Sequence, residues 1–188
     1  YEATRTQVSK FINANSSNEI IFTNNTNQAI NIAAYGWAKK FLKKEDIIVL
    51  SEMEHHANIV PWLKLKEEKG IKLIFLPITQ DYRLDYMSLP NLPQIKLIAL
   101  THASNVLGTI NPLEKIIPYF KKLNPQIKIL IDAAQSIPHL PLDVQKLNID
   151  FLAFSSHKML GPSGVGVLWA KEELLEFEGV VTDVLPEG

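Results

Sequence analysis

Short apolar runs that alternate with longer segments of helical period constrain the fold of this chain more than any other feature of its sequence. This alternation favours parallel strands joined by helical crossovers over an antiparallel sandwich. Runs such as Ile129-Leu130-Ile131 are apolar on both faces of a strand, which is typical of a strand buried between two helical layers. We therefore expect an α/β fold, with a mostly parallel sheet sandwiched between helices.

The same pattern predicts approximate bounds for each element. The expected strands comprise residues 19–23, 47–50, 72–76, 97–101, 128–132, 151–155 and 165–170. The expected helices comprise residues 2–12, 26–43, 59–69, 113–124 and 171–177. In the second helix, Ala29, Ala33 and Trp37 share one face, which we expect to pack against the sheet.

The charge balance and the absence of cysteine exclude several classes of protein. The 19 basic and 20 acidic residues give a net charge of −1, so there is no basic surplus for binding nucleic acid. No apolar run approaches the roughly 20 residues that cross a bilayer, and residues 1–10 lack a secretory signal, so we expect a soluble, cytoplasmic protein with no membrane contact. Without cysteine, these residues hold no disulfide, thiolate metal site or cysteine nucleophile.

Polar residues follow five of the expected strands, at the point where each strand ends. In an open parallel sheet, ligands bind in the crevice beyond the carboxyl ends of the strands, so these residues are the candidates for a site. They are Thr26, the segments 51–56 and 101–105, Asp132 with Gln135, and the segment Ser155-Ser156-His157-Lys158. We expect all five strand ends to direct polar groups toward one edge of the sheet.

Asp132 and Lys158 carry the clearest chemical signal, although each has an ordinary structural interpretation. A carboxylate that ends a buried strand is costly unless a cation or a hydrogen-bond donor meets it, yet Asp132 alone is better explained as a cap on the following turn. Lys158 alone is equally well explained as a solvated loop lysine. It precedes a glycine-rich stretch, 161–166, whose backbone can pass close to a ligand, and a partly desolvated lysine there can form a Schiff base.

The combination of a lysine, an acid and an anion site is what pyridoxal phosphate requires. Its aldehyde condenses with a lysine, its ring nitrogen stays protonated beside a carboxylate, and its phosphate suits a helix N-terminus. Lys158, Asp132 and Thr26 can fill these three roles. His55, at the neighbouring strand end, is placed to stack on the ring.

Three other kinds of site fit the sequence less well. The five histidines show no H-x-x-x-H or H-E-x-x-H spacing, which disfavours a metal site. No G-x-G-x-x-G follows the first strand, which disfavours a nicotinamide enzyme. Ser155 and Ser156 lack the G-x-S-x-G elbow of a hydrolase nucleophile.

Four long motifs, in order along the chain, closely resemble those of the cysteine desulfurases, which belong to the class V aminotransferase group of fold-type I pyridoxal phosphate enzymes. The motifs occupy residues 51–62, 101–109, 131–136 and 154–164. The E-H-H-A-N-I-V-P-W run is most similar to the branch that serves iron–sulfur cluster assembly and includes selenocysteine lyase-like activity. The resemblance implies that residues 1–175 form the cofactor-binding large domain. Residues 176–188 are expected to be a divergent or discontinuous tail.

The resemblance also implies a role for each site residue. Lys158 would be the Schiff-base lysine, Asp132 would pair with the pyridinium nitrogen, and His55 would stack on the ring. The remaining residues would bind the phenolic oxygen (Gln135), lie beside that oxygen and the substrate carboxylate (Asn105), or hold the phosphate (Thr26, Ser155 and His157).

Two departures from the family pattern concern the phosphate cup and the lysine loop. The usual Gly-Thr-Thr is replaced by Asn25-Thr26-Asn27, and Ser156 stands where glycine is common. Asn25 is an acceptable substitute for glycine because asparagine tolerates left-handed backbone geometry.

The activity that the resemblance implies is conversion of L-cysteine to L-alanine, with sulfur passed as a persulfide to an enzyme cysteine outside these residues. A homodimer and a sulfur-acceptor protein are also implied. Selenocysteine lyase or another class V enzyme, a non-catalytic scaffold and, remotely, a Rossmann-type oxidoreductase remain alternatives.

Overall fold

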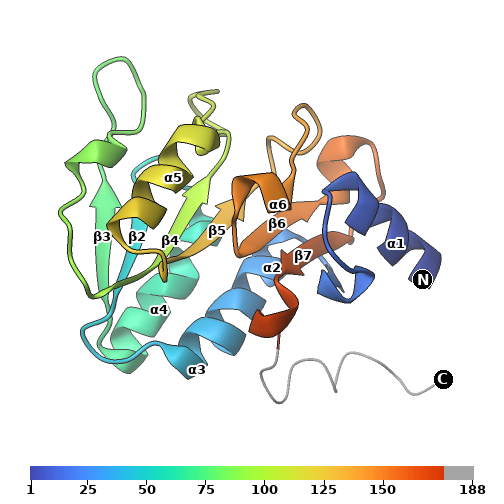
Figure 1. Cartoon of the computed structure of the whole chain (residues 1–188). Helices are drawn as coiled ribbons and strands as arrows, with labels where there is room; N and C mark the ends of the chain where they lie inside the picture. Colours follow the sequence, from blue (N-terminus) through green and yellow to red (C-terminus); the bar gives the residue numbers. More distant parts are fainter. Residues whose placement is uncertain (176–188) are drawn as a thin grey trace.

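The computed structural model describes residues 1–175, which form a seven-stranded sheet with helices on both faces (Figure 1). The order of strands across the sheet is β1-β7-β6-β5-β4-β2-β3. Their bounds are Ile20–Thr23 for β1, Ile47–Ser51 for β2, Lys72–Leu76 for β3, Ile95–Thr101 for β4, Lys128–Asp132 for β5, Phe151–Ser155 for β6 and Gly166–Ala170 for β7. The expected α/β fold and its strands are confirmed, each strand within two residues of its predicted bounds.

The direction of the strands places their carboxyl ends at one edge. Strands β2 to β6 pair with one another in parallel, whereas β7 is antiparallel to both β6 and β1. Because β7 is antiparallel to both neighbours, β1 runs in the same direction as β6. The five polar strand ends selected from the sequence, those of β1, β2, β4, β5 and β6, therefore lie on the same side.

The helices cover both faces of the sheet, as expected. Helices α1 (Glu2–Phe11), α5 (Leu113–Leu123) and α6 (Val144–Leu147) lie on one face; α2 (Thr26–Ile32), α3 (Lys39–Phe41) and α4 (Val60–Lys69) lie on the other (Figure 1). Short 3₁₀ turns occupy Ser17–Glu19 (η1), His56–Asn58 (η3), Tyr86–Ser88 (η4), Ser156–Met159 (η5) and Glu172–Leu174 (η6). Within the described residues, no helix is both long enough and apolar enough to cross a membrane.

Successive residues of a buried strand supply the two halves of the core. In β5, Ile129 and Ile131 pack with Phe120 of α5, whereas Leu130 belongs to the core of the opposite face, with Trp37 and Leu65. All six side chains are buried. A strand with apolar residues at every position therefore packs against both helical layers.

Two of the predicted helices differ from the structure. Residues 26–41 form one continuous helical segment, but its middle, Ala33–Ala38 (η2), is π-helical; Ala29, Ala33 and Trp37 are buried, as expected. The helix expected over 171–177 is wrong for its described part, which contains only the 3₁₀ turn η6, with Leu174 packed into the core. The expected tail, 176–188, lies outside the described residues.

Two buried carboxylates stabilise the opposite edge of the sheet, where the parallel strands begin. Glu19, which precedes β1, accepts hydrogen bonds from the Trp169 indole (2.9 Å) and the Asn15 amide (3.0 Å). Asp150, which precedes β6, accepts from Lys121 (3.0 Å) and Lys171 (3.1 Å). Buried acids are tolerated when cations or hydrogen-bond donors surround them in this way.

Candidate active site

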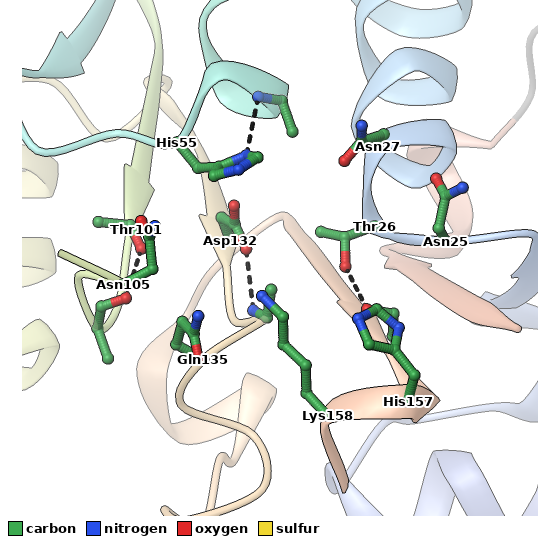
Figure 2. A pocket seen from close by; sticks show the side chains of 14 residues that line it. Asn25, Thr26, Asn27, His55, Thr101, Asn105, Asp132, Gln135, His157 and Lys158 are labelled. Atoms are coloured by element: carbon green, nitrogen blue, oxygen red, sulfur yellow. Dashed lines mark hydrogen bonds between the residues drawn. The ribbon is translucent and has the colours of Figure 1, made fainter. Parts of the chain in front are cut away.

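A cavity of about 240 Å³ lies beyond the carboxyl ends of the parallel strands (Figure 2). All eight site residues predicted from the sequence line it, and they lie at the ends of β1, β2, β4, β5 and β6 or in the segments that follow them. The lining consists of Asn25, Thr26, Asn27, His55, Ala57, Thr101, Ala103, Asn105, Asp132, Ala134, Gln135, Ser155, His157 and Lys158. Strand direction therefore brings together residues that lie far apart in the sequence.

Asp132 ends β5 and is buried at the floor of the cavity, with 4% of its surface exposed. Its Oδ1 accepts a hydrogen bond from the Ala134 amide (2.9 Å), so the carboxylate does cap the following turn. Burial raises the pKa of Asp132, although the Ala134 amide and the charges of Lys158 and His55 act in the opposite direction. A cationic group bound in the cavity would therefore offset the cost of burying this carboxylate.

Lys158 lies on the 3₁₀ turn η5, directly after β6, and its side chain extends toward Asp132 (Figure 2). Lys158 is exposed at the open side of the cavity, so its amine is solvated in this structure. The Ser156 hydroxyl holds the loop that follows, since its one hydrogen lies between the carbonyl oxygens of Pro162 and Val165. The loop therefore has a defined path even though the lysine itself is solvated.

Thr26, which follows β1, and Ser155, which ends β6, form a pair of hydroxyls. Both side chains are buried, and Thr26 Oγ1 donates to Ser155 Oγ at 2.9 Å. Asn25 caps helix α2, where its side chain accepts a hydrogen bond from the Gln28 amide (2.9 Å). His157 lies beside this pair at the rim (Figure 2).

Gly166 allows the Asn25 loop to pass close to strand β7. A Cβ atom at Gly166 would lie 2.5 Å from the carbonyl carbon and 2.6 Å from the Cα of Asn25. We expect Gly166→Ala to lower the free energy of unfolding by about 2 kcal/mol, because backbone must move to relieve the overlap. Chemical denaturation measures this change, and a loss below about 0.5 kcal/mol would contradict the close approach.

His55 enters the cavity from the side opposite Lys158 (Figure 2). It is the N-cap of the 3₁₀ turn η3, and its Nδ1 accepts a hydrogen bond from the Ala57 amide at 3.1 Å. Because Nδ1 is an acceptor, a neutral His55 carries its proton on Nε2. The imidazole therefore has one fixed edge and one edge free for a ligand.

Asn105 and Gln135 complete the predicted set. Asn105 lies in the loop after β4, where the Ser104 hydroxyl accepts hydrogen bonds from the Val106 (3.3 Å) and Leu107 (3.1 Å) amides. Gln135 lies in the turn after β5 and is half-buried. Both amide side chains are on the same side of the cavity as Thr101 (Figure 2).

Glu54 is a buried ionisable residue next to this site, in the candidate segment 51–56, to which the sequence assigned no role. Its carboxyl group contacts the Ser51 hydroxyl and accepts hydrogen bonds from Asn58 Nδ2 (2.7 Å) and the Thr101 amide (2.9 Å). Burial raises the pKa of Glu54 to about 7, and the charge of Asp132 acts in the same direction, whereas the three hydrogen bonds oppose the shift. Thr101, Asn25 and Asn27 also line the cavity, although no role was assigned to them from the sequence.

The raised pKa of Glu54 predicts a pH-dependent contribution to stability. Between the ordinary pKa of 4.5 and about 7, the native state holds a proton that the unfolded state has lost, so the free energy of unfolding falls as pH rises. From pH 5 to pH 7.5 this contribution falls by about 2 kcal/mol. We expect Glu54→Gln to lack it, because glutamine does not titrate. Urea denaturation of both proteins at both pH values measures the difference, and equal pH dependence in the two would contradict the prediction.

Comparison with known proteins places this geometry in a family. Residues 1–179 match the family described as Aminotransferase class-V. A protein named cysteine desulfurase from Serratia proteamaculans is 47% identical over 177 residues, which are 93% of this chain and 43% of that protein. The chain thus spans less than half the length of this curated relative.

Solved structures agree with the sequence match. The crystal structure of the cysteine desulfurase CsdA from Escherichia coli superposes with a TM-score of 0.88 and 40% sequence identity, covering 94% of this chain and 44% of that one. A variant of C-DES, with glycine covalently linked to its PLP cofactor, superposes with a TM-score of 0.82 and 26% identity, covering 94% and 47%. The fold and the sequence therefore point to the same group of proteins.

Proposed function

The chain belongs to the class V aminotransferase family, and we propose that it is the cofactor-binding large domain of a pyridoxal phosphate-dependent cysteine desulfurase. The proposed activity converts L-cysteine to L-alanine and passes the sulfur to an enzyme cysteine as a persulfide. The observation that carries the proposal is the convergence of Lys158, Asp132 and His55 in one cavity at the carboxyl ends of the strands. The names of the relatives at 46–47% identity support the choice of substrate.

The donor set of the cavity fits pyridoxal phosphate. Within the part of the chain that the structure describes, Oδ2 of the buried Asp132 accepts no protein hydrogen bond, which leaves it for a cationic ring nitrogen. Lys158 supplies an amine on a side chain that extends toward Asp132, and Thr26 with Ser155 supplies two hydroxyls for a phosphate (Figure 2). When bound, this cofactor withdraws electrons from the Cα of an amino-acid substrate.

Three residues are proposed to act on the cofactor ring and the substrate. Lys158 would attach the cofactor covalently, and its amine would carry the Cα proton of the substrate. Asp132 holds a proton on the ring nitrogen, because its buried charge is best offset by a cation. His55 covers the ring face through its imidazole, whose orientation is set by the hydrogen bond from Ala57.

The other predicted residues are proposed to bind the polar groups around the ring. Gln135 binds the phenolic oxygen, and Asn105 lies beside that oxygen and the substrate carboxylate. Thr26, Ser155 and His157 hold the phosphate. The chain contains no cysteine, so the thiolate that takes the sulfur is not among these 188 residues.

A homodimer and a sulfur-acceptor protein are part of the same proposal. Exposed apolar side chains flank the cavity: Leu160, two residues after Lys158, is fully exposed, and Val106, next to Asn105, is 81% exposed. A second subunit seated there would close the open side of the site. Analytical ultracentrifugation tests the dimer, and a monomer at micromolar concentration would contradict it.

A cytoplasmic location belongs to the proposal as well, and cell fractionation tests it.

The decisive experiment is covalent trapping of the cofactor. The purified protein is incubated with pyridoxal phosphate, reduced with borohydride, and its intact mass and tryptic peptides are measured. We expect one cofactor mass on the peptide that contains Lys158. An adduct spread over several surface lysines, or none, would contradict the proposed function.

A further inference from the structure

The buried carboxyl group of Glu54 connects three elements around the His55 turn. It contacts Ser51 at the end of β2, the backbone amide of Thr101 at the end of β4, and the side chain of Asn58 at the end of the 3₁₀ turn η3. None of the roles proposed above uses this residue. A buried group with three polar partners beside a ligand cavity therefore calls for an explanation of its own.

The orientation of these hydrogen bonds follows from the indole of Trp62. Trp62 Nε1 donates to Asn58 Oδ1 (3.0 Å), so the Nδ2 of Asn58 faces Glu54 and donates to its Oε2. The Thr101 amide donates to Oε1. Both carboxyl oxygens therefore act as acceptors, and a proton on Glu54 has its place in the contact with the Ser51 hydroxyl.

Both ends of the η3 turn are held by this arrangement. His55 begins the turn, and its Nδ1 accepts from Ala57; Asn58 ends the turn, and Glu54 binds its side chain. The same carboxyl group binds Thr101, which lines the cavity beside Asn105 (Figure 2). The turn that carries the imidazole is thus joined to the neighbouring strand end through one side chain.

We propose that Glu54 is a positioning residue, which fixes the His55 turn against the end of β4 and so sets the place of the imidazole over the cavity. The consequence for cofactor affinity rests on the proposed function, whereas the effect on the turn does not. Glutamine is the informative replacement because a carboxamide has one acceptor oxygen. Its NH₂ group must then face either the Thr101 amide or Asn58 Nδ2, and donor meets donor.

Glu19→Gln is the matched control. Glu19 is also a buried glutamate that accepts from a tryptophan indole and a backbone amide, but it lies at the opposite edge of the sheet. A loss of stability common to both variants measures the general cost of replacing a buried carboxylate. Effects confined to Glu54→Gln report on the His55 turn.

The test measures amide hydrogen exchange at Ala57 and the dissociation constant of pyridoxal phosphate for the unsubstituted protein and both variants. In Glu54→Gln we expect exchange at Ala57 to accelerate about tenfold, because the turn opens locally. We also expect the dissociation constant to rise about tenfold. In Glu19→Gln both quantities should stay within about twofold of the unsubstituted protein.

The two arms separate this inference from the proposed function. Unchanged exchange at Ala57 in folded Glu54→Gln overturns the positioning role. Failure of the unsubstituted protein to bind pyridoxal phosphate overturns the proposed function, and exchange at Ala57 still decides the role of Glu54. If Glu54→Gln does not fold, Ser51→Ala removes one contact of the carboxyl group and should accelerate exchange at Ala57 about threefold; unchanged exchange there likewise overturns the role.

Discussion

A Lys158→Ala protein no longer forms a covalent bond with pyridoxal phosphate, and its formation of alanine from L-cysteine falls at least about 10⁴-fold. Lys158 lines the cavity, and its side chain extends toward Asp132 (Figure 2). The same amine is proposed to move the Cα proton, so one substitution removes both attachment and proton transfer. Borohydride trapping followed by mass spectrometry measures the first loss. Alanine release, measured in the complete desulfurase of which these residues are the proposed large domain, measures the second.

An exposed lysine outside the site provides the control for this prediction. Lys115 lies on α5, which covers one face of the sheet, and Lys115→Ala should retain both the adduct and the rate. A covalent adduct of normal stoichiometry in Lys158→Ala would show that another lysine attaches the cofactor. Normal alanine release from Lys158→Ala would contradict its role in proton transfer.

The place of the candidate site could be predicted from the sequence by two simple rules, whereas the roles of Asn105, Gln135, Ser155 and His157 came from the family resemblance. Strands that are apolar on both faces, such as Ile129-Leu130-Ile131, indicate a sheet buried between helices, and parallel strands end at a common edge. The eight strand-end residues to which a role was assigned, from Thr26 to Lys158, therefore line the same cavity. Strand β7 is antiparallel to both β6 and β1, so β1 runs in the same direction as β6. The end of β1 therefore lies at the same edge as the ends of the other strands.

The hydrogen bonds that hold the segments around the site together could not be predicted in the same way. Glu54 binds the amide of Thr101, which is 47 positions away in the chain, and nothing in a local pattern indicates that contact. Lys158 is exposed because no described residue covers the open side of the cavity. The position of a residue at a strand end does not indicate whether its side chain is covered. Long-range hydrogen bonds and the open side of a site therefore require the three-dimensional structure.

The prediction of a helix over residues 171–177 was wrong for a related reason. Residues 171–175 have a helical pattern of charges, yet Lys171 reaches back to the buried Asp150 at 3.1 Å. Leu174 packs into the core beside the sheet. Because these tertiary contacts compete with helix formation, they override a weak local preference over so few residues.

Asp132→Asn should leave covalent attachment of the cofactor intact but lower alanine formation about 10³-fold. The substitution keeps the size of the side chain and its hydrogen bond from Ala134, but it removes the negative charge at the floor of the cavity. A neutral carboxamide no longer holds a proton on the ring nitrogen, so electron withdrawal from the substrate weakens while the reaction at Lys158 continues. Borohydride trapping and alanine release, measured on the same preparation, separate the two steps.

Asp150→Asn is the control for this prediction. It distinguishes the loss of any buried negative charge from the loss of the charge of Asp132. Asp150 is as buried as Asp132 and is bound by lysines, but it lies at the edge where the parallel strands begin. Its replacement should lower stability, because three lysines lose a buried partner, while the rate per folded molecule stays within about twofold of the parent. If Asp132→Asn formed alanine at the parent rate, the charge at the cavity floor would have no part in electron withdrawal. If Asp132→Asn and Asp150→Asn lost activity equally, the loss would reflect lower stability. Asp150 lies far from the cavity, so its charge has no direct effect on a bound ring.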